Sequence, residues 1–482
     1  MARMVLLNDG QFEAAEPFGN ITEQQETVRS AIKLAIDSNK PLVIHFHGGL
    51  VNRKNGITIA DNLYPKYEDA GGVPLFFVWQ TGFIETIKTN YKDAFKGRFV
   101  QWAIKKLTSR VKSKLSDKLD GDLFRSGVAT SDDEFTEAEL QSLKNDIEKS
   151  TDFNTIIKGL NAAVSKSFKD DIPEDGNVFR SAISNKTDND VDESMLIETS
   201  CMDPTLFVDE GSQENTRGLI SAAALKVKLI KAIIATAKGV ISRYRRNTDH
   251  GLHATIMEEL SRRIHGDHIG SAVWGMMKKD SADAFFDGNA GDFLLRTLEN
   301  YENPPRVLLV GHSAGAIFVC NLLRNSTSGA FDVALLAPAV SYKYFNETVN
   351  GQSDRIGNFR IYTMTDENER KDALINGAKF IYPSSLLYLI SGILEADSDK
   401  RPDIDCPILG MQRFYDTNYN ARPHDDNLLS DVRQYLDSFT NGIVWSKSDA
   451  GLGLATTAID HGAFDNNDQT VASLQHLIKN GF

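Results

Sequence analysis

The segment RVLLVGHSAGAIFVCNLL, residues 306–323, joins two apolar runs through Gly311, Ser313 and Gly315. The first run has the length and composition of a buried strand, and the second has those of a helix. A serine at such a sharp turn has a strained backbone and projects from the carboxyl edge of a parallel sheet, where ligands bind in open α/β sheets. The flanking glycines let strand and helix approach closely. The segment therefore predicts a serine hydroxyl that is exposed and rigidly held.

Strands and helices alternate on both sides of this turn. Apart from the strand that ends at Gly311, strands are expected at residues 41–50, 74–80, 331–340, 359–366 and 441–446. A helix is expected over 57–70, where Pro65 is predicted to kink or end it. A strand, a helix and a strand within this length indicate a parallel sheet. The chain is therefore predicted to have an α/β fold with a mostly parallel sheet flanked by helices.

The middle of the chain has a different composition. Residues 85–285 contain few strand-like runs, so we predict a core made of residues 1–84 and 286–482, interrupted by a large helical insertion. The stretch near residues 170–215 is acidic and aperiodic, and it is predicted to be a mobile loop within the insertion. An insertion at this place suggests a cap or lid over the sheet.

One segment of the insertion, residues 219–246, is predicted to be a long amphipathic helix. Its expected apolar face consists of Ile220, Ala223, Val227, Ile230, Ile234, Ala237 and Ile241. Lysines lie off this face. A helix that covers the core of the insertion is one interpretation, and a helix that contacts a membrane surface or a protein partner is another.

Composition excludes several classes of function. The net charge of −13 argues against a nucleic-acid surface, because phosphate binding needs clustered Lys and Arg. The three cysteines are far apart and lack CxxC spacing, and residues 1–20 lack the features of a signal peptide, so a cytoplasmic location is expected. No phosphate-binding or dinucleotide-binding glycine motif follows a strand, and the histidine pairs HGLH and HGDH lack the HExxH arrangement of a zinc site. No cofactor and no metal are expected.

Two motifs together resemble the α/β-hydrolase superfamily, in particular its lipases and esterases. They are GHSAG around Ser313 and HFHGGL around His47, and the resemblance extends over about residues 38–82 and 300–475. It implies an oxyanion hole formed by the backbone N–H groups of Gly49 and Ala314. Leu50 is an alternative donor to Gly49, and His47 is expected to brace the loop.

The resemblance also implies a catalytic triad in the chain order Ser, acid, His. Asp366 follows an expected strand and His461 precedes the last expected helix, so they match this order behind Ser313. His424 is the alternative base. The alternative acids are Glu367, Glu369, Asp403, Asp405 and Asp460.

The sequence thus predicts a cofactor-free serine hydrolase that cleaves a carboxylic ester of a small molecule or lipid through an acyl-enzyme. Two alternatives remain open. One is a thioesterase or a peptidase with the same triad, because the motif does not specify the leaving group. The other is a non-catalytic module of similar fold that binds a protein partner, or touches a membrane, through its insertion.

Overall fold

A computed structural model describes most of the chain. The described residues are 2–49, 51–79, 93–115, 133–167, 192–208, 220–265, 271–327, 329–349, 354–373, 382–395, 405–415 and 426–482. Their main feature is an eight-stranded sheet in the order β2-β1-β4-β3-β5-β6-β7-β8. The strands are β1 (Met4–Asn8), β2 (Gln11–Phe12), β3 (Leu42–Phe46), β4 (Val73–Trp79), β5 (Val307–His312), β6 (Phe331–Leu336), β7 (Ile356–Met364) and β8 (Ile443–Ser446). A separate small sheet pairs β9 (Ser448–Asp449) with β10 (Ala455–Thr456).

The sheet confirms the predicted α/β class. All adjacent strands of the sheet pair in parallel except β1 and β2, which pair antiparallel. The predicted strand–helix–strand unit is β3, α2 (Arg53–Asp69) and β4, and Pro65 lies inside α2 without ending it. Strand β1 was not predicted, because its apolar run is only a few residues long and no helical or strand pattern precedes it.

Apolar side chains alternate between the two faces of the sheet and form two cores. Val5 and Leu7 of β1 belong to one core with helices α1 (Ile21–Asp37) and α12 (Gly315–Asn325). Leu6, between them, belongs to the other core with helices α2 and α17 (Asp468–Asn480). Because both faces are covered by helices, the strands read as continuous apolar runs.

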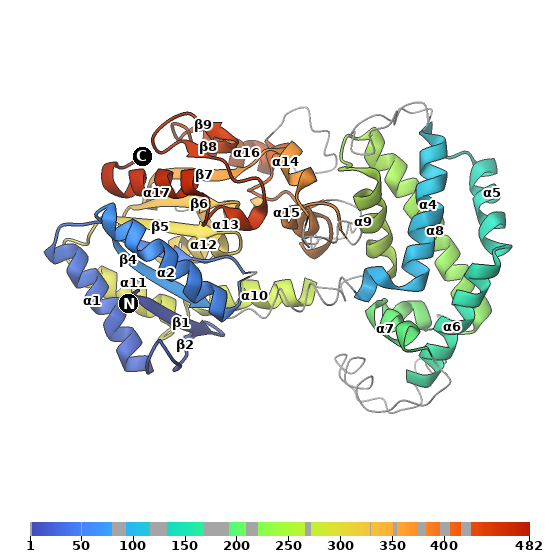
Figure 1. Cartoon of the computed structure of the whole chain (residues 1–482), viewed down its shortest axis with the longest axis horizontal. Helices are drawn as coiled ribbons and strands as arrows, with labels where there is room; N and C mark the ends of the chain where they lie inside the picture. Colours follow the sequence, from blue (N-terminus) through green and yellow to red (C-terminus); the bar gives the residue numbers. More distant parts are fainter. Residues whose placement is uncertain are drawn as a thin grey trace.

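Helices make up the described residues between β4 and β5. They are α4 (Arg98–Lys114), α5 (Glu137–Glu148), α6 (Thr151–Ser167), α7 (Glu193–Cys201), α8 (Ala222–Arg245), α9 (Leu252–Ile264), α10 (Ser271–Asp283) and α11 (Ala290–Glu299). Figure 1 shows α4 to α9 grouped to one side of the sheet, with α10 between this group and the sheet. No helix within the described ranges has both the length and the apolar composition needed to cross a bilayer.

Further helices follow the later strands. They are α13 (Tyr342–Val349), α14 (Asp366–Lys371), α15 (Leu386–Leu389), which continues as a π-helical turn (Ile390–Leu394), and α16 (Asp426–Asp437). The predicted acidic loop near residues 170–215 lies mostly outside the described residues. Its described part differs from the prediction, because Glu193–Cys201 is helical and a 3₁₀ turn follows at Pro204–Phe207.

Helix α8 forms as predicted, and its expected apolar face is buried in part: Ile230, Ala237 and Ile241 are buried, whereas Ala223 is exposed. Leu225, Leu229 and Ile233 are fully buried, whereas Val227 is 52% exposed. The buried face contacts helices α4, α5, α6 and α9, so most of the apolar surface of α8 lies inside this group of helices. The prediction that α8 covers a core is therefore confirmed for this face.

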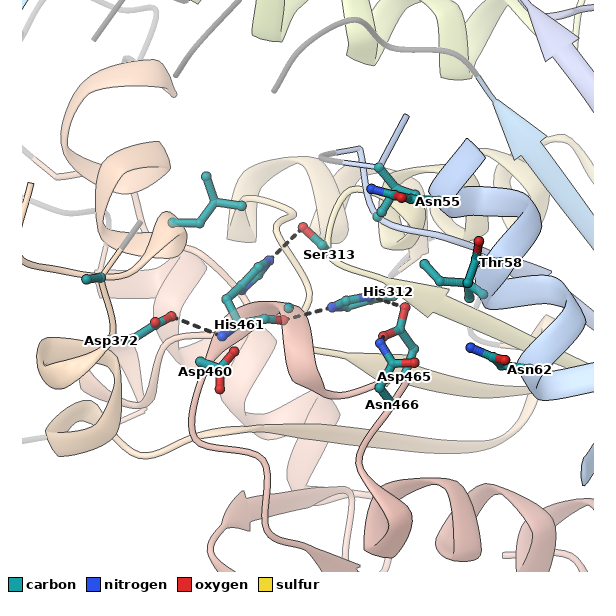
Figure 2. Close-up of a pocket in the computed structure, with 16 residues that line it drawn as sticks. Asn55, Thr58, Asn62, His312, Ser313, Asp372, Asp460, His461, Asp465 and Asn466 are labelled. Atoms are coloured by element: carbon teal, nitrogen blue, oxygen red, sulfur yellow. Dashed lines mark hydrogen bonds and ion pairs between the residues drawn. The ribbon is translucent and has the colours of Figure 1, made fainter. Parts of the chain in front are cut away.

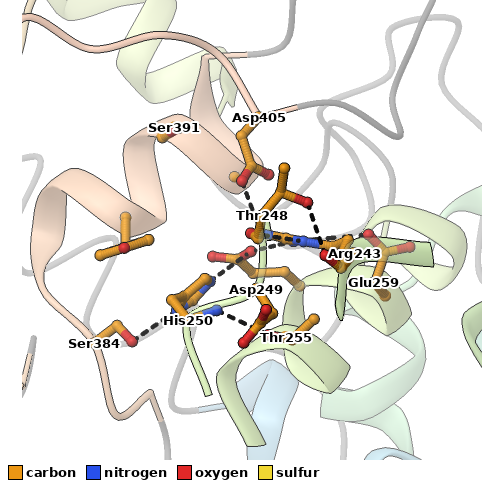
Figure 3. Close-up of polar contacts among 12 residues, drawn as sticks. Arg243, Thr248, Asp249, His250, Thr255, Glu259, Ser384, Ser391 and Asp405 are labelled. Atoms are coloured by element: carbon orange, nitrogen blue, oxygen red, sulfur yellow. Dashed lines mark hydrogen bonds and ion pairs between the residues drawn. The ribbon is translucent and has the colours of Figure 1, made fainter. Parts of the chain in front are cut away.

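A buried cluster of charges connects α8 and α9 to the segment after α15. Arg243 of α8 donates to Glu258 of α9 at 2.6 Å and to Asp405 at 2.7 Å, and Arg262 of α9 also donates to Asp405, at 2.6 Å (Figure 3). Beside them, His250 lies 2.9 Å from the Ser384 hydroxyl. The carboxylates and guanidinium groups neutralise one another in a site without solvent, which is the condition under which buried charges are tolerated.

Candidate active site

The turn between β5 and α12 holds Ser313 in a strained conformation. Its φ is 54°, in the left-handed region that non-glycine residues rarely adopt. A Cβ on Gly315 would lie 2.2 Å from the Phe46 carbonyl oxygen, and one on Gly311 would lie 2.9 Å from the Ala316 nitrogen. Glycine is therefore required on both sides of the serine by the close approach of β3, β5 and α12, as the sequence predicted.

Ser313 and His461 lie within hydrogen-bond distance. The Nε2 atom of His461 is 2.8 Å from the Ser313 Oγ atom (Figure 2), although 148 positions separate the two residues in the chain. His461 begins a 3₁₀ turn, His461–Ala463, between β10 and α17. Ser313 and His461 are both buried, so the predicted exposure of the serine is wrong: Ser313 is only 2% exposed. The sequence predicted this pairing, and the structure brings the two residues together.

The second ring nitrogen of His461 has no hydrogen-bond partner among the described residues. Burial, together with the smaller effect of the positive charge of His312, lowers the pKa of His461 to about 3. The ring is therefore neutral near pH 7. A neutral ring that accepts the serine proton at Nε2 carries its own hydrogen on Nδ1.

The glycine loop after β3 lies against the serine turn. A Cβ on Gly49 would be 2.9 Å from the Ala314 Cβ, so the two predicted oxyanion residues are neighbours. Ala314 caps α12, and the first N–H groups of a helix have no partner within it. His47 braces the loop as expected: its Nδ1 atom is 2.8 Å from the Gly48 oxygen, and its Nε2 atom accepts from the Trp79 backbone at 3.2 Å. The alternative donor, residue 50, lies outside the described residues.

The structure does not bring Asp366 to His461. The Oδ1 atom of Asp366 accepts from the Tyr388 hydroxyl at 2.6 Å and from Arg413 at 3.0 Å, and its Oδ2 atom contacts Arg370 at 3.2 Å. These contacts lower the pKa of Asp366 against the opposing effect of burial. The Asp366 carboxylate is thus held by two arginines and a tyrosine and does not contact the His461 ring.

The other candidates are placed as follows. Glu367 pairs with Lys371, and the buried Glu369 accepts from Ser385. Asp405 belongs to the charge cluster with Arg243, while positions 403 and 424 lie outside the described residues. Asp460 is exposed and directly precedes His461 in the chain, and both residues line the cavity described below.

Asp372 is the carboxylate that contacts the base, and sequence reasoning missed it. Its Oδ2 atom accepts the backbone N–H of His461 at 3.0 Å (Figure 2). Asp372 is the C-cap of α14, the helix that Asp366 begins. The sequence indicated only that an acidic residue after strand β7 would approach His461. Which of these residues does so is decided by the path of the chain through α14.

A cavity of about 410 Å³ opens at the Ser313 hydroxyl. Its described lining is Gly48, Val51, Asn55, Thr58, Ile59, Asn62, His312, Ser313, Asp372, Ala373, Leu386, Asp460, His461, Gly462, Asp465 and Asn466. Asn55, Thr58 and Asn62 come from one face of α2 (Figure 2). No Lys or Arg occurs among these described residues, so the cavity presents amides, hydroxyls and carboxylates.

His312 and Asp465 form a second buried polar pair beside the dyad. The His312 Nδ1 atom is 3.1 Å from the Asp465 Oδ2 atom, and its Nε2 atom is 2.9 Å from the His461 carbonyl oxygen. Sequence reasoning treated His312 only as a neighbour of the serine, because the pairing depends on how the loop after β10 folds back.

Within the described ranges, no group of three or more His, Cys, Asp or Glu side chains is arranged to bind a metal ion. Comparison of the chain with protein-family models, with curated proteins and with solved structures gave no match.

Proposed function

We propose that the protein is a serine hydrolase of the α/β-hydrolase type that cleaves carboxylic esters through an acyl-enzyme. The observation that carries this proposal is the 2.8 Å contact between His461 Nε2 and Ser313 Oγ at a strained turn. A nucleophile and base within hydrogen-bond reach, beside backbone donors, are the requirements of acyl transfer.

The chemistry follows from these positions. Ser313 Oγ attacks the ester carbonyl while its proton passes to His461 Nε2, and the N–H groups of Gly49 and Ala314 stabilise the resulting oxyanion. His461 then gives that proton to the leaving alcohol as the carbon–oxygen bond breaks. Water, deprotonated by His461, attacks the acyl-enzyme and releases the acid and the free serine.

We assign the acid of the triad to Asp372. Its Oδ2 atom accepts the backbone N–H of His461, and we propose that during catalysis the side chain turns so that the carboxylate accepts from Nδ1 of the same residue. There it would hold the tautomer and stabilise the imidazolium. Asp366, bound to Arg413 and Tyr388, is not available for that role.

The cavity favours a compact, polar substrate. Its volume of about 410 Å³ is near the lower end of the range of ligand pockets, and the α2 amides Asn55 and Asn62 offer hydrogen bonds to a substrate. The described lining contains the carboxylates of Asp372, Asp460 and Asp465 but no Lys or Arg, and the one cation proposed there, His312, is paired with Asp465; this balance of charge disfavours an anionic ester. The buried face of α8 contributes nothing to the described lining, so we propose a small neutral or cationic ester in preference to a long-chain lipid.

The helical region from α4 to α10 is proposed to act as a cap. A Cβ on Gly49 would lie 2.4 Å from the Met277 Sδ atom, so α10 contacts the proposed oxyanion loop directly. Movement of α10 would therefore alter the donors at the reacting carbonyl. Contact of this region with a lipid surface or a protein partner stays a prediction.

Labelling with a fluorophosphonate probe, read by intact mass, tests the proposal. We expect one adduct on the wild-type protein and none on Ser313→Ala or His461→Ala. Rates on matched ester, thioester and anilide substrates then identify the leaving group. Labelling that survives in Ser313→Ala would show that the nucleophile is another residue. A folded wild-type protein that neither reacts with the probe nor hydrolyses any of the three substrates would favour the non-catalytic binding module.

A further inference from the structure

We propose that His312 is a positioning residue that is protonated at neutral pH: an imidazolium, paired with Asp465, that fixes the loop carrying the base His461 to the strand carrying the nucleophile. The proposal assigns a role to a residue outside the triad. Its effect on catalysis rests on the proposed function, whereas its protonation state does not.

The two partners of His312 decide its protonation. The Asp465 carboxylate accepts at Nδ1, at 3.1 Å, and the backbone carbonyl of His461 accepts at Nε2, at 2.9 Å. A backbone carbonyl and an ionised carboxylate can only accept hydrogen bonds. A neutral imidazole carries one N–H, so one of its nitrogens would direct a lone pair at an acceptor oxygen. Only the imidazolium satisfies both contacts.

A nearby buried histidine shows the opposite pattern. His47 has one acceptor, the Gly48 oxygen at Nδ1, and one donor, the Trp79 backbone N–H at Nε2. One N–H on the ring satisfies this arrangement, and burial lowers the pKa of His47 to about 4. The hydrogen-bond partners thus predict a neutral His47 and a charged His312 a short distance apart.

The electrostatics of the pair agree with this geometry. Burial disfavours the charge on His312, but the charge and the hydrogen bond of Asp465 outweigh it and raise the pKa of His312. Burial likewise disfavours the charge on Asp465, and His312 reverses that effect and lowers the pKa of Asp465. The other titratable groups that face the pair are His461, His45, His47 and Tyr67.

The position of His312 explains what the pair does. His312 directly precedes Ser313 and is the last residue of β5, so its ring has the same rigid support as the nucleophile. Its bond to the His461 carbonyl restrains the backbone of the base, while Asp465 ties the far side of the same loop to the ring. Displacement of a catalytic group by about 1 Å can cost about 100-fold in rate. Deprotonation of His312 would set a lone pair against one of its two acceptors and loosen this restraint.

Three substitutions separate the charge from the hydrogen bonds. His312→Leu removes both. His312→Gln keeps a donor near the position of Nε2 without the charge. Asp465→Asn can donate its amide N–H to a neutral His312, which then keeps its bond to the His461 carbonyl. His476→Gln, in α17 and away from the cavity lining, controls for the loss of a histidine.

Nitrogen NMR of the protein labelled at histidine reports protonation directly, with His312→Gln assigning the signal. We expect His312 to show two protonated ring nitrogens at pH 7 and one in Asp465→Asn. A neutral His312 in the wild-type protein would overturn the proposal, whether or not the protein is an enzyme.

The rate of probe labelling and the kcat of ester hydrolysis test the positioning role. We expect His312→Leu to lower both by at least about tenfold with little change in KM, and His312→Gln to recover part of the loss. In the wild-type protein, kcat should fall at alkaline pH as His312 loses its proton. In Asp465→Asn, where His312 is already neutral, this fall should be absent. Wild-type rates and an unchanged pH profile in His312→Gln and Asp465→Asn would refute positioning by the pair. If His312→Leu does not fold, these two variants decide the question. Failure of the proposed function is distinguished by Ser313→Ala, which would then label like the wild type.

Discussion

Exchanging the acid of the proposed triad gives the sharpest test of the site. The pKa of His461 falls from 6.5 to about 3, mainly through burial, which corresponds to about 5 kcal/mol of added cost for charging this ring. His461 must carry that charge in the transition state, so a carboxylate at Nδ1 has to offset most of the cost. Asp372→Asn is therefore expected to lower kcat by about 10²–10⁴-fold with little change in KM.

Asp366→Asn is the matched control, because it makes the same chemical change in the same short helix. Asp366 accepts from Arg413 and Tyr388 and does not contact the base. Losing its charge should cost about 1.5–3 kcal/mol of folding free energy, the range for hydrogen bonds to charged groups. Its kcat should stay within a few-fold of the wild type.

The assay pairs steady-state kinetics on a reactive ester with urea unfolding of both variants. We expect opposite outcomes: Asp372→Asn folds with near-normal stability and reacts slowly, while Asp366→Asn reacts normally and unfolds at lower urea. A normal kcat in Asp372→Asn together with a large loss in Asp366→Asn would refute our reading of the geometry and restore the acid that the sequence suggested.

Three further perturbations test other parts of the structure. Gly315→Ala places a Cβ 2.2 Å from the Phe46 carbonyl oxygen, so we expect lower thermal stability and slower probe labelling; normal values for both would contradict the close approach. Asp405→Asn should cost about 3–5 kcal/mol in urea unfolding, because it removes the buried carboxylate that Arg243 and Arg262 share, whereas Asp37→Asn in an exposed pair should cause little change. Because His461 is unprotonated above its lowered pKa in the free protein, kcat/KM should persist well below pH 6.5; an acid limb of kcat/KM near pH 6.5 would show that the free base is not buried as described.

Features formed by residues close together in the chain could be predicted from the sequence, whereas features formed by distant residues could not. The turn at Ser313 was predictable because its glycines, its strand and its helix are neighbours in the chain. His461 was predictable as a base from its order and from the following helix. Asp372 was not, because several acids follow β7 and only the folded path of α14 selects among them. The buried face of α8 was predicted only in part, because periodicity shows that a helix has an apolar face but several overlapping faces of this helix contain apolar residues.

His312 shows a second limit of sequence reasoning. Its role depends on two acceptors, a carboxylate and a carbonyl, that reach it from a loop more than a hundred residues later. No spacing rule links these positions. The number of protons on the His312 ring can be inferred only when both of its hydrogen-bond partners are known. Donor and acceptor chemistry is then sufficient to decide it.

The two ends of α14 contact a segment beside the charge cluster and the proposed base, His461. At its start, Asp366 binds Arg413, whose guanidinium group also donates to the carbonyl oxygens of Thr248 and Asp249, at 3.2 Å and 3.0 Å. At its end, Asp372 holds the backbone of His461. These contacts join the segment between α8 and α9, through one short helix, to the carboxylate proposed to support the base. Charged contacts have definite partners and lengths, so this connection is more specific than apolar packing at the same place would be. The arrangement gives the helical region a physical route to the reacting groups that does not require it to enter the cavity.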